Sequence, residues 1–388
     1  AHSWEGWFVL CGPGPVFGAL SAQLRRNGAP RTRVGHTGSM SLAERLPAAA
    51  PAETRTTAPA ASRREHIVYV FFGLWLLIGL SLDGWAHRNQ PELESFFTPW
   101  HAVFYTGFTG GAAWLAWMVY RRRPSVSSFV DAIPSGYELA VVGLGMFAVG
   151  GVGDGIWHTI FGIETSIDAL LSPTHLLMLS GILLSVTAPI RAYWRTPGSA
   201  VATGFRSFLP VTLSTALVTT ALAFFFMYAN GLTNWPMSRN YVPYVNELEA
   251  THGVLSTVVT TVIVLGPMLF LLRRWRPPLG TFAVVGAVHG LAMAGLDAFT
   301  LWWQVAAVVA CGLAADVLTQ RKDIDRRSTI RRIGVVVPLV LWTVSTLVVH
   351  LAWTVRWPPE LWIGQIVLAV MIGVALSLLA APPKIPAD

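Results

Sequence analysis

The sequence predicts an all-α fold, a polytopic membrane helix bundle of about ten transmembrane helices. Of the 388 residues, 53% are hydrophobic and only 12% are charged, a composition too apolar for an ordinary soluble domain. From Ile67 onward, apolar segments of about 18 to 25 residues recur, each long enough to cross a hydrocarbon core of roughly 30 Å as a helix. The expected spans lie near residues 66–86, 96–120, 137–160, 172–193, 208–231, 248–273, 279–298, 300–318, 332–354 and 360–381.

Residues 1–64 differ in composition from the rest of the chain and are expected to form a disordered N-terminal extension. They are rich in Ala, Pro, Gly and Arg and show no sustained hydrophobic periodicity. Because the chain begins without Met and Met40 follows a Gly-Ser pair, residues 1–39 are either native or derived from upstream of the native start. The transmembrane domain is expected to comprise residues 65–388.

Local signals set the ends of several spans. Thr98 and Ser172 are typical N-cap residues, and each is followed by a Pro at the first helical position. The third span, 137–160, contains several Gly residues, which favour close helix packing. The seventh and eighth spans are separated only by residues 297–303, so the chain must turn there within a very short segment.

The distribution of basic residues predicts the orientation in the membrane, because cytoplasmic loops carry an excess of Lys and Arg. Only Arg88, Arg239 and Arg356 lie on the loops expected outside the cytoplasm. Both termini are therefore expected in the cytoplasm, and the protein is expected in the inner (plasma) membrane. The net charge of +7 does not indicate nucleic-acid binding, since the basic residues fall in short clusters: Arg63–Arg64, Arg121–Arg123, Arg191 with Arg195 and Arg206, Arg273–Arg274 with Arg276, Arg321–Arg332, and Lys384.

One stretch occurs twice. Residues 83–87 (Asp-Gly-Trp-Ala-His) lead through a polar loop into residues 98–101 (Thr-Pro-Trp-His), and residues 154–158 (Asp-Gly-Ile-Trp-His) lead likewise into residues 172–175 (Ser-Pro-Thr-His). We interpret this as an internal repeat of a helix pair, with copies at 66–120 and 137–193. Each copy is expected to place one Asp and two His at the extracytoplasmic edge of the membrane. Ionisable side chains at that depth are costly unless paired or ligated, and they indicate a functional site.

The spacing within each copy predicts contact between its Asp and His side chains. Asp83 and His87, like Asp154 and His158, are four residues apart and share one helix face. Three interpretations stay open at this point. Both side chains bind one metal ion, the Asp orients a metal-binding imidazole from outside the coordination sphere, or the pair is a plain hydrogen bond at a helix end.

A fainter third copy begins the sixth span. Glu249 precedes His252 by three residues, a spacing found in carboxylate-bridged di-metal bundles, although a single such pair is a weak signal. His289 lies near the middle of the seventh span, where a packing role is as plausible as ligation. The candidate metal ligands are Asp83, His87, His101, Asp154, His158 and His175, followed by Glu249 and His252.

Nitrogen and oxygen ligands without thiolate suit a divalent transition metal such as copper, zinc, iron or manganese. The two cysteines, Cys11 and Cys311, supply no cluster of sulfur ligands. The order Asp, three residues, His, then a second His about a dozen residues further on resembles the copper-binding pattern in a membrane subunit of particulate methane and ammonia monooxygenases. This resemblance is confined to the two short stretches and implies copper among the candidate metals.

These observations lead to two main functional hypotheses. The first is a metal site at the extracytoplasmic face that serves a membrane oxidoreductase or hydrolase acting on a lipid-soluble or other small molecule. The second is a proton- or cation-coupled transporter that uses the Asp and His residues as a relay. A third possibility is a b-type cytochrome with His101 and His175 as axial ligands. The sequence does not decide whether the protein is an enzyme.

Overall fold

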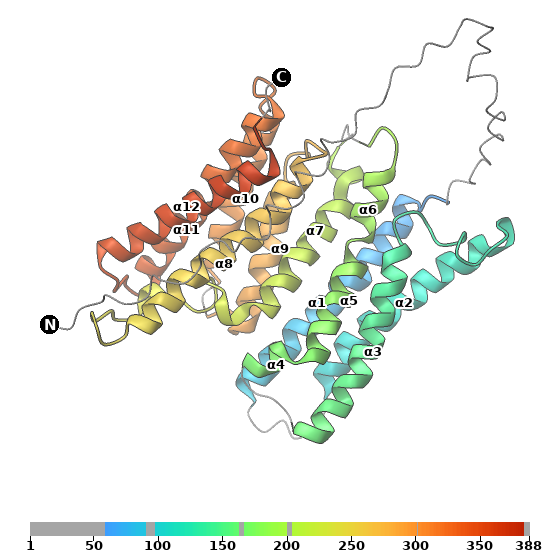
Figure 1. Ribbon diagram of the computed structural model, residues 1–388, viewed down its shortest axis with the longest axis horizontal. Coiled ribbons are helices and arrows are strands. Elements are labelled where there is room, and N and C mark those ends of the chain that lie inside the picture. The colour runs from blue at the N-terminus through green and yellow to red at the C-terminus, as the bar shows by residue number, and fades with distance from the viewer. Residues whose placement is uncertain (1–58, 91–97, 163–166, 200–203, 301, 384–388) are drawn as a thin grey trace, which may run out of the picture. The chain divides into compact units, whose positions relative to one another are not determined.

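The computed structural model describes residues 59–90, 98–162, 167–199, 204–300 and 302–383, and the regular elements in these ranges are helices (Figure 1). Most of the predicted N-terminal extension lies outside the described residues. The first helix begins at Arg63, where Ser62 and Glu65 form a capping box.

Each of the ten expected spans coincides with a helix or, in one case, with two consecutive helices. The predicted and observed ends differ by a few residues, as expected for boundaries read from composition. The helices are α1 (Arg63–Asn89), α2 (Pro99–Arg122), α3 (Glu138–Phe161), α4 (Ile167–Leu171), α5 (Pro173–Val186), α6 (Ala188–Arg195), α7 (Phe205–Phe225), α8 (Glu247–Leu272), α9 (Thr281–Leu296), α10 (Gln304–Gln320), α11 (Arg326–Ala352) and α12 (Pro359–Ala380), with short 3-10 turns at Arg123–Ser125, Met227–Ala229 and Pro236–Ser238.

Seven segments of the described chain are long and apolar enough to cross a membrane: α1, α3, α5 with α6, α7, α8, α11 and α12. Helices α9 and α10 are apolar but shorter, and α2 is long but richer in Gly, Thr and Trp. Large hydrophobic side chains such as Val152 and Ile160 are 69% and 67% exposed on the surface of α3. A surface of this kind suits lipid rather than water. The chain is therefore a polytopic membrane protein.

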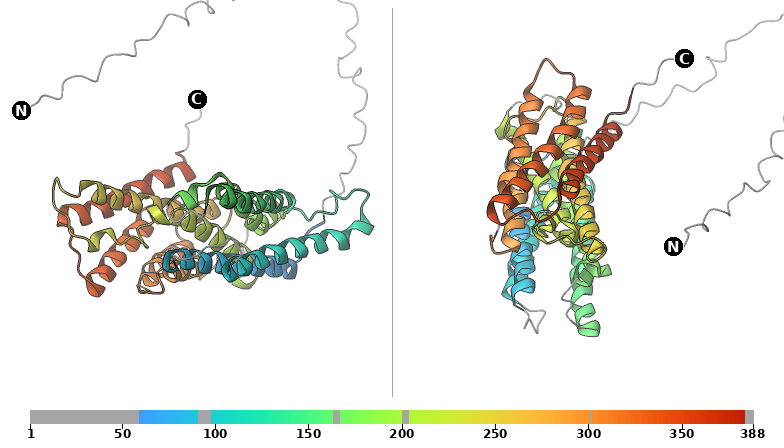
Figure 2. Two further views of the ribbon diagram at one scale, coloured as in Figure 1. Left: turned by 90° about the horizontal axis from the view of Figure 1, so that it is seen from below. Right: turned by 90° about the vertical axis from the view of Figure 1, so that its left-hand side faces the viewer.

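The N-terminal half consists of two helix pairs, α1 with α2 and α3 with α5 (Figures 1 and 2). Helix α7 packs against α1, α5 and α9 and so joins these pairs to the remaining helices. Within the first pair, Gly79 of α1 lies directly against the backbone of Phe104 in α2. In the second pair, Gly143 of α3 lies against the backbone of Gly181 in α5. These glycines allow the backbones to approach closely and fix the relative position of the helix ends.

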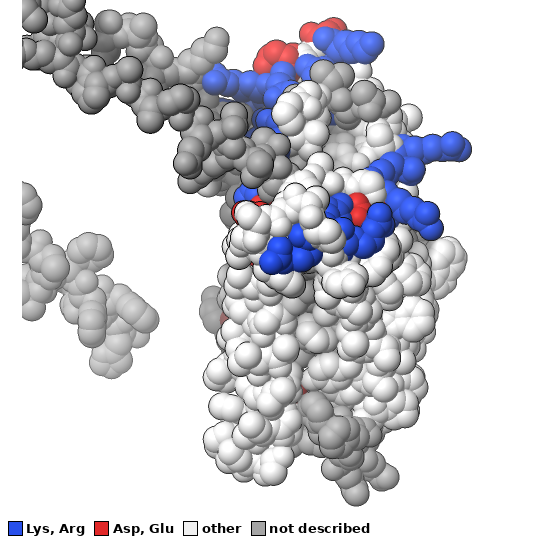
Figure 3. All heavy atoms as spheres, turned by 90° about the vertical axis from the view of Figure 1, so that its right-hand side faces the viewer, with Lys and Arg blue, Asp and Glu red and all other residues white. Residues whose placement is uncertain are grey.

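Charged side chains gather at one end of the helices. Figure 3 shows Lys and Arg residues at that end and a largely uncharged surface beyond it. At this end, Glu65 near the start of α1 forms an ion pair of 2.8 Å with Arg122 at the end of α2. The repeated Asp and His residues occupy the opposite ends of these two helices, because Asp83 and His87 are near the last turn of α1 and His101 is in the first turn of α2.

We expect Gly79→Ala to destabilise the helix bundle, although Ala is the better helix former. A Cβ atom at this position would overlap the backbone of Phe104, which cannot move without separating α1 from α2. Overpacking of this kind costs about 1–3 kcal/mol, so the thermal unfolding midpoint in detergent should fall. Gly145→Ala is the matched control, because a Cβ at Gly145 meets no atom within 4 Å. Equal midpoints for the two variants would contradict the packing argument.

Candidate metal centre

The first triad joins the end of α1 to the start of α2. Thr98 caps α2 by accepting a hydrogen bond from the backbone N–H of His101, as its position before Pro99 predicts. This cap directs the imidazole of His101 toward α1, and its Nδ1 lies 2.9 Å from Thr98 Oγ1 and 3.3 Å from Asp83 Oδ1. On the other side of the same carboxylate, His87 Nε2 lies 3.7 Å from Asp83 Oδ2.

The second triad joins the end of α3 to the start of α5 in the same way. Ser172 caps α5 by accepting from the backbone N–H of His175. His175 Nε2 then lies 3.3 Å from Asp154 Oδ1, and His158 Nε2 lies 3.4 Å from Asp154 Oδ2. Asp154 is only 1% exposed, so its carboxylate is almost entirely removed from water.

A hydrogen bond indicates which ring nitrogen of His158 carries the proton in the second triad. Gly162 O lies 3.1 Å from His158 Nδ1, and a carbonyl only accepts, so Nδ1 carries the hydrogen. For His175, Nδ1 lies 2.7 Å from Ser172 Oγ, which lies 3.1 Å from Thr174 Oγ1, and Thr174 donates to Asp154 Oδ1 at 3.0 Å. When Nδ1–H is the donor to Ser172, the Nε2 lone pairs of both neutral rings face the carboxylate.

Lone pairs that face a carboxylate repel it unless a cation lies between them. The cation is either a proton on each Nε2, which makes an imidazolium–carboxylate ion pair, or a metal ion. The N···O distances from 3.3 to 3.7 Å in both triads leave room for a metal ion, because they exceed the usual hydrogen-bond range of about 2.7–3.2 Å. A tetrahedral ion that binds N and O at about 2.1 Å holds those two atoms about 3.4 Å apart.

Each triad therefore offers three ligand atoms, all within 4.8 Å of one another, to a metal ion. Two imidazoles and one carboxylate leave at least one coordination position open, as in catalytic rather than structural sites. In the second triad Ser172, Thr174 and the carbonyl of Gly162 bind the ligand residues from outside, and such contacts orient ligands and tune the metal. The first triad has Trp100 where the second has Thr174, so it lacks the equivalent hydroxyl.

Both triads line one cavity of about 250 Å³. The Asp83 and Asp154 carboxylates are close enough to interact electrostatically across it. The remaining wall is mostly apolar, with a few polar residues such as Arg88 and Asn234. Its apolar side chains come from α1, α2, α3, α4, α5, α7 and the turn after α7: Leu80, Phe104, Phe147, Leu170, Met178, Ile182, Phe224, Phe225 and Met227.

The structure does not bring Glu249 and His252 to this cavity. Glu249 forms an ion pair of 2.6 Å with Arg239 near the surface, and His252 is exposed one turn into α8. His289 is buried in α9, and neither of its ring nitrogens has a hydrogen-bond partner within the described part of the chain. It does not line the cavity either.

Sequence reasoning missed three contributors to the site. Thr174 was visible inside the repeated stretch, and its offset of one residue from His175 was the available signal. Arg88 lines the cavity and forms an ion pair of 2.9 Å with Asp297 at the end of α9, a contact across the fold that spacing does not predict. Tyr105 lies one turn after His101, with the two rings stacked and their centroids 6.2 Å apart.

Comparisons with known proteins assign no family to the chain: no family model, curated protein or solved structure matches it. The resemblance to the monooxygenase copper pattern therefore rests on the two Asp/His stretches alone.

Proposed function

We propose that the two triads bind transition-metal ions and that the protein is a metal-dependent membrane oxidoreductase or hydrolase. The main support is that both triads line a single, mostly apolar cavity. Within each triad, the N and O atoms are spaced as ligands of one ion would be. A merely structural Asp–His pair at a helix end needs no cavity. A coordinatively open metal in an apolar chamber has the features of a reaction site.

The donor set favours copper, zinc or iron, since imidazole binds all three well and no thiolate is present in either triad. The local resemblance to the monooxygenase pattern favours copper among them. A metal bound there would activate either dioxygen as an electrophile or water as a nucleophile. The chain itself would hold the ligands in place through Ser172 and Thr174 and surround them with an apolar wall that includes Phe104, Phe147 and Phe224.

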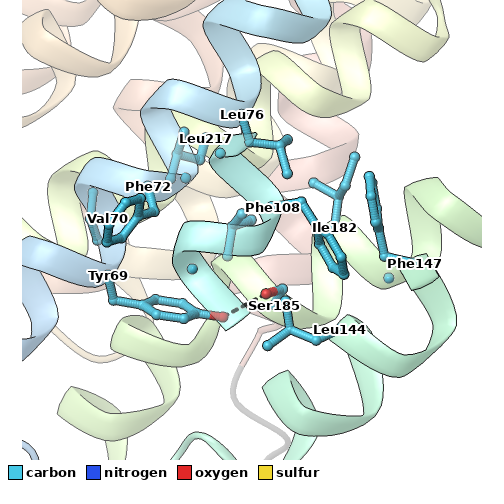
Figure 4. A pocket seen from close by; sticks show the side chains of 15 residues that line it. Tyr69, Val70, Phe72, Leu76, Phe108, Leu144, Phe147, Ile182, Ser185 and Leu217 are labelled. Carbon is cyan, nitrogen blue, oxygen red and sulfur yellow. Dashed lines mark hydrogen bonds between the residues drawn. The ribbon is translucent and has the colours of Figure 1, made fainter. Parts of the chain in front are cut away.

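A transporter would need its polar path to continue from the cavity toward the other side of the membrane. Figure 4 displays the adjoining slot, which shares Phe147 and Ile182 with the metal cavity. Its free space is about 30 Å³, enough for one or two water molecules. Its walls are apolar except for Tyr69 and Ser185, whose hydroxyls bond each other at 2.6 Å. This arrangement favours a reaction site over a proton or cation relay.

We further propose that all ten predicted spans cross the inner membrane, with the basic end of the helices in the cytoplasm and the triads outside it. The alternation of basic loops supports this orientation. We also propose that the two helix pairs are copies of one unit. Their shared order of Asp, His, capping hydroxyl, Pro and His supports the duplication.

The proposed function is tested by elemental analysis of protein purified from membranes in mild detergent without chelators. We expect at least one bound transition-metal ion per wild-type chain and loss of most of it in His101→Ala/His175→Ala, because each triad loses one of its three ligands. His350→Ala is the control, since this exposed residue ends α11 far along the chain from both triads. An equal metal content in wild type and the double variant, both monodisperse, would contradict the proposed ligands.

A second prediction concerns Thr174→Val. The substitution preserves shape but removes the hydroxyl that donates to Asp154, so the carboxylate loses its orienting bond. Changes to such supporting groups typically weaken metal affinity about 10–100-fold. Competition with a chelator of known affinity measures the effect. Ser180→Ala serves as the control because this α5 hydroxyl donates only to Leu176 O in its own helix. If both variants bind as tightly as wild type, the hydrogen-bond chain does not support the site.

A further inference from the structure

A groove of about 670 Å³ runs between α2 and α3 on the surface of the bundle. It exists because the two helices belong to different pairs: α2 packs along α1 and α3 packs along α5. Val152 and Ile156, which line it, are 69% and 56% exposed. Both residues lie within a membrane-spanning helix, so the groove opens to lipid.

The groove contains few groups that could form a hydrogen bond with a ligand. Its hydroxyl groups belong to Thr109, Thr159 and Tyr105. The two Thr hydroxyls donate to carbonyls of their own helices, at 2.8 Å for Thr109 and 2.7 Å for Thr159. The remaining lining is apolar, including Phe108 and Gly151. A charged or strongly hydrogen-bonding molecule would therefore lose its hydration there without compensation.

Two aromatic side chains of the groove, Tyr105 and Phe108, contact residues that line the metal cavity, and Phe108 stacks on Phe147 with their centroids 4.4 Å apart. Tyr105 contacts a triad residue directly. Its ring is stacked on His101 and lies with its centroid 4.2 Å from Phe104 and 6.2 Å from Phe147, all three of which line that cavity. Its other side faces the groove. The hydroxyl lies over α3, where a Cβ at Gly151 would be 3.0 Å away. Packed aromatic side chains thus form the wall between the groove and the metal cavity.

We propose that the α2–α3 groove is the entrance through which a small, neutral, apolar molecule dissolved in the bilayer reaches the triads, with Tyr105 as the gate. The inference deepens the proposed function and rests on it, since it assigns the substrate class and the route to the same metal site. In this proposal, rotation of the Tyr105 side chain joins the groove to the cavity. The end of the cavity that carries Arg88 and Asn234 remains the route for water and polar products.

The test measures how fast two chelators remove metal from the protein in proteoliposomes. The probe 2,2′-bipyridine is neutral and enters the bilayer, whereas a disulfonated bathophenanthroline stays in water. Ala148→Phe fills the groove from α3 without replacing a buried side chain, because Ala148 lines it and is exposed. Val149→Phe is the control, since it adds bulk to the neighbouring lipid-facing position outside the groove.

We expect Ala148→Phe to slow removal by bipyridine about tenfold, equivalent to ~1.4 kcal/mol in activation free energy, and to leave removal by the sulfonated chelator unchanged. Val149→Phe should behave as wild type. Tyr105→Ala should accelerate bipyridine alone, at a metal content verified beforehand.

Three results would overturn the inference in distinguishable ways. Wild-type protein without metal would remove the proposed function and the inference with it. If Ala148→Phe binds metal but leaves the rate of metal removal by bipyridine unchanged, the groove is not an entrance and only accommodates a lipid acyl chain. Equal slowing of both chelators would indicate a change in the metal site itself rather than in its entrance.

Discussion

The burial of two carboxylates is the constraint on which the rest of the site depends. Asp83 and Asp154 are 9% and 1% exposed and lie near the ends of apolar helices, where an unpaired charge is strongly unfavourable. Two imidazoles contact each carboxylate, one from the same helix and one from the next. The helix caps and the contacts between paired helices in the N-terminal half keep these groups together.

Two structural features satisfy this constraint. The capping hydroxyls of Thr98 and Ser172 set the direction in which the His residues of α2 and α5 point. The glycine contacts, such as Gly79 with the Phe104 backbone, set how near the paired helices approach. Capping involves residues close in sequence, whereas glycine packing joins residues far apart in the chain. Both are needed to bring the Asp of one helix into contact with the His of its paired helix.

Much of the helical arrangement could be predicted because a membrane-crossing helix has a compositional signature of fixed length. Contacts inside one stretch, such as Asp154 with His158, also follow from spacing. The meeting of both triads in one cavity does not, since it depends on packing through α7. Spacing also made Glu249 a second-choice ligand, whereas its position at the surface places it beside Arg239. The short turn after α9 is made possible by left-handed Ala298 and Phe299, which sequence does not signal.

The two triads are similar in composition but differ in detail. His101 presents Nδ1 to its Asp, whereas His175 presents Nε2, and only the second triad includes a hydroxyl from the position held by Trp100 in the first. Two ions bound in such unequal surroundings would differ in affinity and in exchange rate. A chain supplied with limiting metal would then fill one triad before the other, so its half-loaded form would be a single defined species rather than a mixture.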